Sequence, residues 1–172
     1  LRSIAKRFNR SVSRNLSTVL NRRNVEYNRL LVEYSSLLAS MNGAEPLSRI
    51  TDSLIGNPEH VIEVGEHILA ASLIEFYLQY VYCSKFVDFK NIKVFVELGG
   101  GSGKQIELLK KLHPDICFII FDIAPQLYVC EQYLKALFPK SLVSYRETRD
   151  WKKLKNPTGK ILICGTNQFP LI

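Results

Sequence analysis

Apolar residues change their spacing along this chain of 172 residues, and the change divides it into two regions. Up to about residue 90 they recur at helical intervals, which predicts helices over 25–38 and over about 59–83. The first of these should end near Asn42-Gly43. From residue 91 onward, short apolar runs alternate with helical spacing, as in a parallel α/β sheet. We therefore predict an all-helical N-terminal region over 1–90 and an α/β region over 91–172.

Four apolar runs in the second region predict parallel strands, at 94–97, 115–122, 142–145 and 160–164. The first run is continuous at Val94, Phe95 and Val96, so we expect a strand buried on both faces. Four glycines follow it, at 99, 100, 101 and 103, and residues 105–112 return to helical spacing. The predicted unit is therefore a strand, a glycine turn and a helix.

Glycine in this turn can serve two physical purposes. The backbone can take torsions that a Cβ would forbid, and a ligand can approach the main chain closely. Both favour a nucleotide-like ligand at the carboxyl end of the strand, beside the N-terminus of the following helix.

Spacing separates the nucleotide-binding motifs that could use such a turn. A P-loop needs glycine, and then Ser or Thr, at the positions of Leu98 and Gln105. A dinucleotide fingerprint needs glycine at the position of Lys104 or of Ser102, depending on its first glycine. What remains is an acid, Glu97, followed by alternate glycines at 99, 101 and 103.

A second acid, Asp122, ends the next predicted strand, 25 positions after Glu97. That interval is near the roughly 20 residues expected for a carboxylate that accepts hydrogen bonds from a ribose. The alternative is an Asp that caps the helix beginning near Pro125. We favour the ribose contact, because strand, turn, helix, strand and acid follow in one order.

The pattern Glu97-x-Gly99-x-Gly101-x-Gly103 resembles motif I of the class I S-adenosylmethionine-dependent methyltransferases. The resemblance implies a Rossmann-like sheet, with the glycines against the methionine part of the cofactor and the acid near its amino end. It also implies that the loop over 146–151 contacts adenine and that the exit of the fourth strand lies near the reacting methyl. A surface acid and a rim aromatic are the alternative for Asp150 and Trp151. The candidate cofactor-binding residues are Glu97, Gly99, Gly100, Gly101, Gly103, Asp122, Ile123, Asp150, Trp151 and Asn167.

A nearer resemblance covers roughly residues 45–170. A leading helical region, the turn Gly56-Asn57-Pro58, a long apolar helix, the glycine turn and Phe121-Asp-Ile-Ala-Pro125 follow the order of the sugar O-methyltransferases of bacterial polysaccharide clusters. The pair Tyr133-Leu134 also matches that family. The second strand there ends in Asp-Leu-Pro, whereas this chain has one more residue before Pro125. Near Asn167 the match is only partial.

The resemblance implies S-adenosylmethionine-dependent O-methylation of a sugar hydroxyl in polysaccharide or glycan biosynthesis, without identifying a catalytic base. A methyltransferase acting on RNA or a small molecule is one alternative. Class I enzymes use about seven strands and only four are predicted, so a cofactor-binding fragment without activity, lacking the C-terminal half of the sheet, is another. We expect no metal.

Positive charge is concentrated at one end of the chain. Residues 1–29 contain eight basic residues and one acid, so the whole net charge of +7 lies there. Apolar residues among these bases have helical spacing, which predicts a basic amphipathic start. It could contact an anionic membrane or nucleic acid, or act as an organelle transit peptide; a solvated helix is the simplest interpretation.

The remaining composition limits the setting of the protein. Four cysteines occur without Cys-x-x-Cys spacing, which favours a reducing compartment and a cytoplasmic protein. A membrane-peripheral location, through the basic start of the chain, is the alternative. No run of about 18 uninterrupted apolar residues predicts a membrane span. The histidines at 60, 67 and 113 carry no pattern that assigns them a catalytic task, and we expect His113 at the end of a helix.

Overall fold

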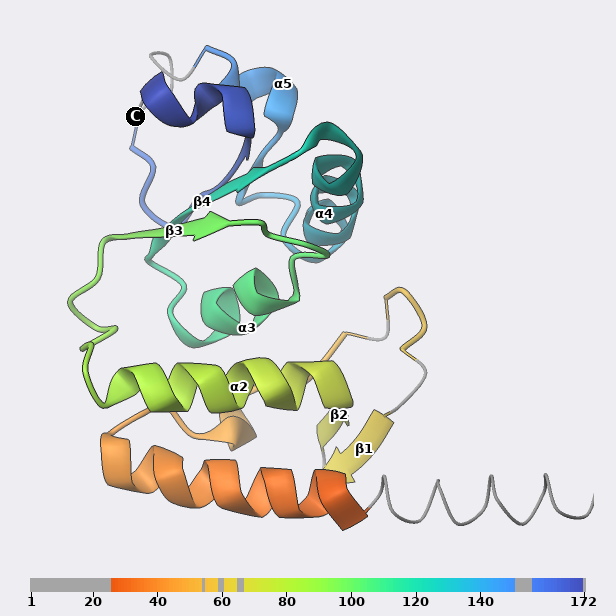
Figure 1. The fold of residues 1–172 in the computed structure, drawn as a ribbon, viewed down its shortest axis with the longest axis vertical. Helices are drawn as coiled ribbons and strands as arrows, with labels where there is room; N and C mark the ends of the chain where they lie inside the picture. The colour runs from red at the N-terminus through yellow and green to blue at the C-terminus, as the bar shows by residue number, and fades with distance from the viewer. Residues whose placement is uncertain (1–25, 54, 59–60, 65–66, 151–155, 172) are drawn as a thin grey trace, which may run out of the picture.

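The computed structural model describes residues 26–53, 55–58, 61–64, 67–150 and 156–171 (Figure 1). Residues 1–25 of the basic segment over 1–29, and the candidate residue Trp151, lie outside these ranges. In Figure 1 the described elements form stacked layers: a first helix at the base, a second helix, a third helix, and then the sheet.

The N-terminal region begins with a helix over residues 26–42, which ends at Gly43 as predicted. Gly43 has a φ of +68°, the left-handed conformation that commonly terminates helices. A short 3-10 helix, η1 (Leu47–Arg49), follows. Helix α2 (Ala71–Ser84) then packs over the first helix and η1.

The predicted helix over 59–83 is wrong in its first half. Residues 61–64 and 67–70 form an antiparallel pair of strands, β1 (Val61–Val64) and β2 (His67–Ala70), and of the predicted range only residues 71–83 belong to α2. The physical reason is local: two runs containing β-branched residues are separated by a two-residue segment that starts with glycine, which is the pattern of a hairpin. The N-terminal region is therefore not all-helical.

The second region contains the predicted four-stranded parallel sheet. Its strands are β3 (Val94–Leu98), β4 (Cys117–Asp122), β5 (Leu142–Val143) and β6 (Ile161–Gly165). Their spatial order is β3-β4-β6-β5, with every neighbouring pair parallel. In the dinucleotide-binding order the fourth strand lies beside the first; here β4 separates β6 from β3. The strand order therefore differs from the dinucleotide-binding one. The parallel sheet with its helices nevertheless makes the class α/β, compatible with a Rossmann-like fold.

Helices connect these strands. They are α3 (Lys104–Leu112), α4 (Ala124–Leu137) and α5 (Tyr145–Thr148), and the 3-10 helix η3 (Thr166–Leu171) follows β6. The predicted third strand is shorter than expected because Ser144 caps α5. The Ser144 side chain accepts a hydrogen bond from the Glu147 backbone N–H, and the Glu147 side chain accepts one from the Ser144 backbone N–H. This capping box starts the helix at Tyr145.

The two faces of the sheet are covered differently. Phe118 and Ile120 of β4, with Ile161 and Ile163 of β6, join the main core against α3 and α4. Cys117, Ile119, Phe121, Leu162 and Cys164 form a smaller cluster on the other face. There Phe121 meets Phe169 of η3 edge to face, with ring centroids 5.3 Å apart.

Strand β3 is not buried on both faces, which corrects the prediction from its continuous apolar run. Among the described residues it pairs with β4 alone, so it lies at an edge of the sheet. Val94, Val96 and Leu98 share the face of the smaller cluster and are 50%, 47% and 66% exposed. Only its alternate residues, such as Phe95, pack against the main core.

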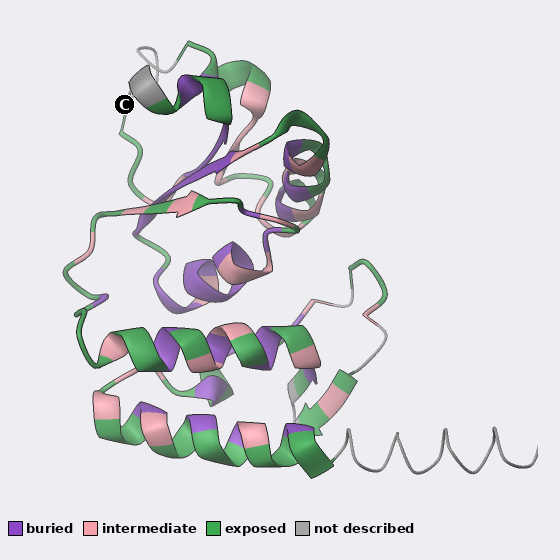
Figure 2. Cartoon of the chain, in the orientation of Figure 1, coloured by how far each residue is buried: buried purple, intermediate pink, exposed green. Residues whose placement is uncertain are grey.

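One hydrophobic core crosses the predicted boundary near residue 90. Leu73, Ile74 and Tyr77 of α2 belong to the same buried cluster as Ile106 and Leu109 of α3. Figure 2 shows buried residues along the facing sides of these helices. The two sequence regions therefore form one packed unit.

Candidate functional site

The glycine turn lies where the sequence predicts it, between β3 and α3. Gly99, Gly101 and Gly103 have φ values of +79°, +54° and +86°, which side chains strongly disfavour. The Gly99 N–H donates to the Phe121 carbonyl over 2.8 Å, and the Gly103 N–H donates to the Gly100 carbonyl over 2.9 Å. The first bond holds the turn beside the tip of β4.

The glycines of this turn divide into two kinds. A Cβ on Gly99 or Gly101 would meet nothing within 4 Å, so these two face open space. A Cβ on Gly100 would stand 2.3 Å from the Ile120 side chain, and one on Gly103 would stand 2.9 Å from Leu134. Gly100 and Gly103 are thus required for packing inside the protein, and only the other two leave the main chain open to a ligand.

Asp122 lies directly beside this turn. Its Oδ2 accepts a hydrogen bond from the Gly101 N–H over 3.1 Å, and its Oδ1 accepts from the Ile123 N–H over 2.7 Å. Among the described residues no side chain caps α4, so Asp122 does not act as the helix cap that the sequence offered as its alternative role. A carboxylate oxygen can accept more than one hydrogen bond, so both oxygens keep capacity for further donors.

Glu97 lies close to Asp122 but has a different environment. Its Oε2 is the one buried side-chain oxygen or nitrogen of the described residues that has no hydrogen-bond partner. Burial raises the pKa of Glu97 to about 7, and the charge of Asp122 adds to the rise. A buried carboxylate without a donor is costly, so this position favours either a proton or a cationic ligand.

The Cys130 thiol faces the same acids from α4. Burial raises its pKa to about 12, and the charges of Glu97 and Asp122 contribute in the same direction. The thiol therefore stays protonated at neutral pH and is a poor nucleophile.

The structure places one remaining candidate at the turn and two farther away. Ile123 is next to Asp122 and is 61% exposed. Asn167 follows β6, which β4 separates from β3, and Asp150 follows α5 after the outermost strand β5. With neighbouring strands about 4.8 Å apart, these two loops are offset from the glycine turn by two and three strands. Of the candidates that the structure describes, only Glu97, the glycines, Asp122 and Ile123 come together.

A buried charge network beside the turn was not predicted from the sequence. Lys104, the first residue of α3, contacts Asp52 Oδ1 at 2.5 Å and Glu107 Oε2 at 3.1 Å. Lys111 and the Tyr133 hydroxyl also bond to the Glu107 carboxylate. The spacing of Lys104, Glu107 and Lys111 is typical of charge pairs on a helix, which usually face solvent; Asp52 is too distant in sequence to be recognised as their partner.

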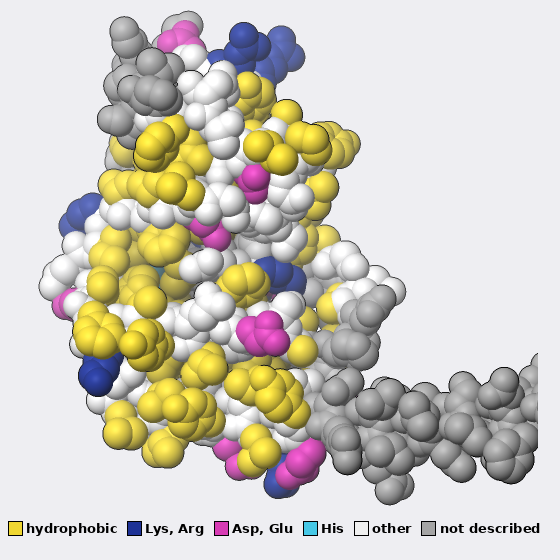
Figure 3. Space-filling view, viewed as in Figure 1, with side chains coloured by type: hydrophobic (Ala, Val, Ile, Leu, Met, Phe, Trp, Pro, Cys, Tyr) yellow, Lys and Arg dark blue, Asp and Glu magenta, His cyan; other side chains and the backbone are white. Residues whose placement is uncertain are grey.

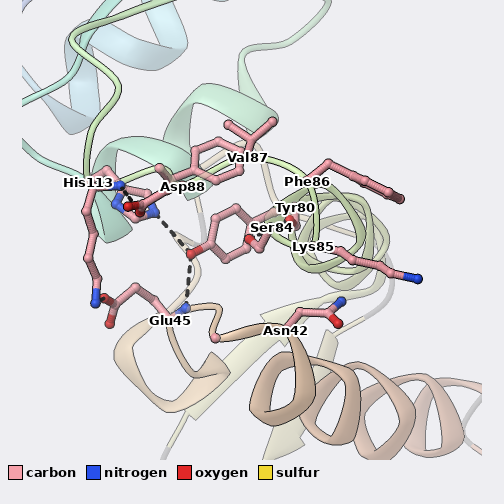
Figure 4. A pocket seen from close by; sticks show the side chains of 12 residues that line it. Asn42, Glu45, Tyr80, Ser84, Lys85, Phe86, Val87, Asp88 and His113 are labelled. Atoms are coloured by element: carbon pink, nitrogen blue, oxygen red, sulfur yellow. Dashed lines mark hydrogen bonds and ion pairs between the residues drawn. The ribbon is translucent and has the colours of Figure 1, made fainter.

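Two adjoining cavities lie at the other end of the sheet. Their volumes are about 350 and 500 Å³, and both are lined by Glu45, Phe89, Lys90 and His113. His113 ends α3 as predicted, but it is buried. Its Nε2 lies 3.0 Å from the Tyr80 hydroxyl (Figure 4), and its ring stacks on Phe89. Burial lowers the pKa of His113.

The described residues contain no group of three or more His, Cys, Asp or Glu side chains that could hold a metal ion. Nor does any helix within them have the length and apolarity to cross a bilayer.

Comparison of the chain with known protein families, curated proteins and solved structures finds no match.

Proposed function

We propose that this protein binds S-adenosylmethionine at the glycine turn and methylates a sugar hydroxyl. The observation that carries the proposal is Glu97 Oε2: a buried carboxylate oxygen without a partner, beside an open main-chain turn and a second carboxylate. Two neighbouring acids at the tip of parallel strands favour a ligand with positive charge and hydroxyl donors. S-adenosylmethionine has both, in its ammonium and sulfonium groups and its ribose.

Each residue has a separate task in this proposal. Glu97 accepts hydrogen bonds from the ammonium group, and Asp122 accepts from the two ribose hydroxyls with the lone pairs that Gly101 and Ile123 leave unused. Gly99 and Gly101 let the ligand lie against the main chain, because no side chain fills the space there.

The cofactor supplies an activated methyl group, so the protein must hold an acceptor oxygen in line with it. The sugar as acceptor is supported by the order of motifs over 45–170 and not by a contact in the site. For this reason the two parts of the proposal need separate measurements.

Cofactor binding is tested by titrating the protein with S-adenosylmethionine in a calorimeter. Asp122→Ala should weaken binding by about 10- to 100-fold, the loss expected for hydrogen bonds to a charged acceptor. Asp115→Ala is the matched control, because Asp115 is an exposed acid just before the same strand, β4, at its opposite end. Absence of any binding by the unaltered protein would refute the proposal, and equal binding by both variants would refute the ribose contact.

The acceptor is tested by transfer of a labelled methyl group to a panel of mono- and oligosaccharides, with total RNA as a parallel sample. Label in the sugars alone supports the sugar assignment. Label in RNA alone would replace it with the alternative that the basic segment over 1–29 suggests.

A further inference from the structure

The helix over residues 26–42 has apolar side chains on its outer side as well as on its inner side. Five exposed residues follow one another at intervals of three and four positions. This outer stripe consists of Tyr27, Leu30, Tyr34, Leu37 and Met41, with exposed fractions between 53% and 71%. In Figure 3 hydrophobic side chains gather along the lower edge of the molecule, over this helix.

The inner side of the same helix already supplies its packing against the protein. Asn28, Val32, Ser35 and Ala39 are buried, also at intervals of three and four. Val32 and Ala39 belong to the main core, and the Ser35 hydroxyl donates to the Val32 carbonyl. The outer stripe is therefore not needed to hold the helix in place.

We propose that the outer stripe is a self-association surface, on which the same helix of a second copy of this chain packs. Strict alternation of three and four positions is the seam of a two-stranded coiled coil, narrower than the apolar face of a helix that covers a globular core. The partner must therefore be a helix with the same repeat. A two-fold pair brings the same patch of both copies together, so each copy supplies such a helix.

The composition of the stripe suits pairing with itself. Tyrosines alternate with aliphatic residues along it, so one copy provides both the large and the smaller side chains that interdigitate. Tyrosine hydroxyls can remain at the wet rim of such an interface while the rings are buried.

The charges beside the stripe favour a protein partner over a membrane. Arg29 lies 3.1 Å from Glu26 and 3.8 Å from Glu33, so the flank largely neutralises itself and does not repel a second copy. An interfacial membrane helix would instead have lysine and arginine along its polar side. Within residues 26–42, which the structure describes, the flank carries two acids and one base.

The area available is sufficient for a weak dimer. If the exposed half of each side chain offers about 100 Å², the stripe buries roughly 500 Å² per copy and about 1,000 Å² in total. This lies at the low end of specific interfaces. We therefore expect a monomer–dimer equilibrium that depends on concentration.

Sedimentation velocity of the whole chain, from micromolar to submillimolar concentration, tests the proposal. The unaltered protein should shift from monomer to dimer, and Tyr34→Glu, at the centre of the stripe, should remain a monomer. Tyr128→Glu is the matched control: Tyr128 lies on α4, is 69% exposed, and should leave dimerisation unchanged. Leu37→Lys repeats the test if circular dichroism shows that Tyr34→Glu has lost helix.

Three results would overturn the proposal. One is an unaltered protein that stays monomeric over the whole range, and another is a Tyr34→Glu variant that dimerises as the Tyr128→Glu control does. The third is a monomer that binds phosphatidylglycerol vesicles through the stripe, which would assign this surface to a membrane.

Discussion

Glu97 and Asp122 are neighbouring carboxylates with different hydrogen-bonding environments. Asp122 receives two backbone hydrogen bonds, from Gly101 and Ile123. Glu97 has a buried oxygen without a donor, so the cost of burying charge falls on it. Its pKa of about 7 is the expected result.

This difference predicts that Glu97→Gln changes the free energy of unfolding by an amount that depends on pH. The folded pKa of Glu97 is raised above its unfolded value of 4.5, so the folded state binds the proton more tightly. The native protein therefore loses stability as pH rises from about 4.5 through 7, and a neutral glutamine avoids that loss. We expect Glu97→Gln to raise the free energy of unfolding by on the order of 2 kcal/mol at pH 8 and to change it little at pH 5.

Urea denaturation at the two pH values measures the effect. Glu75→Gln, an exposed acid on α2, serves as the control and should give the same difference from the unaltered protein at both. A Glu97→Gln variant that behaves like this control would show that Glu97 is not destabilised by its surroundings.

At the scale of elements, the strand, glycine turn and helix form the unit that the sequence predicts best. Its glycines nevertheless have different purposes, which the sequence does not distinguish. Gly100 packs against Ile120 of β4, whereas Gly101 faces open space beside Asp122. The neighbours of each position become known only when β4 and α4 are in place.

Alanine at these two positions should therefore have opposite consequences for stability and binding. Gly100→Ala overlaps the Ile120 side chain and should cost about 3 kcal/mol of unfolding free energy. Gly101→Ala meets only the strain of its positive φ, about 1 kcal/mol, yet it should weaken S-adenosylmethionine binding at least about tenfold by filling the open space.

Thermal denaturation and calorimetric titration separate the two effects. Gly43→Ala is the control for strain alone, because Gly43 also has a positive φ and open space around it but ends a distant helix. If Gly101→Ala binds the cofactor as well as Gly43→Ala does, the ligand does not approach the main chain at this glycine.

The other elements show where local patterns are sufficient. The helix over 26–42 and α3 agree with prediction because each combines helical spacing with a recognisable start or end. Helix α4 begins near Pro125, as expected. The strands β1 and β2 were missed because their residues also fit a helical repeat in the apolar run that continues into α2. Pairing between the two strands, from Val61↔Ala70 to Val64↔His67, makes this segment a pair of strands and not the start of a helix.

At the scale of the whole molecule, the buried charge network joins the N-terminal region to the α/β region. Asp52 accepts from the Ala70 N–H before α2 and pairs with Lys104 at the start of α3. Burial lowers the pKa of Lys104, but its bonds to Asp52 and Tyr133 and the charge of Glu107 outweigh burial and raise it. The lysine therefore remains charged inside the protein.

Lys104→Met should destabilise the protein by on the order of 3 kcal/mol, since it leaves the buried Asp52 and Glu107 without their shared cation. Adding Asp52→Asn should restore part of the loss. Lys90→Met is the control: its lysine is exposed and 3.7 Å from Glu45, so we expect a change within about 0.5 kcal/mol. Equal effects of the two lysine substitutions in urea denaturation would contradict a structural task for the network.

By itself, the sequence determined the glycine turn, the acids at the tips of two parallel strands, and most of the helices, because torsional freedom and apolar spacing are local properties. Only the tertiary structure decided the order β3-β4-β6-β5, the exposure of β3, the isolation of Glu97 and the burial of Lys104. Each of these depends on which distant segment becomes a neighbour. Burial and hydrogen bonding between such segments, rather than the pattern within either one, fix the environment of the candidate site.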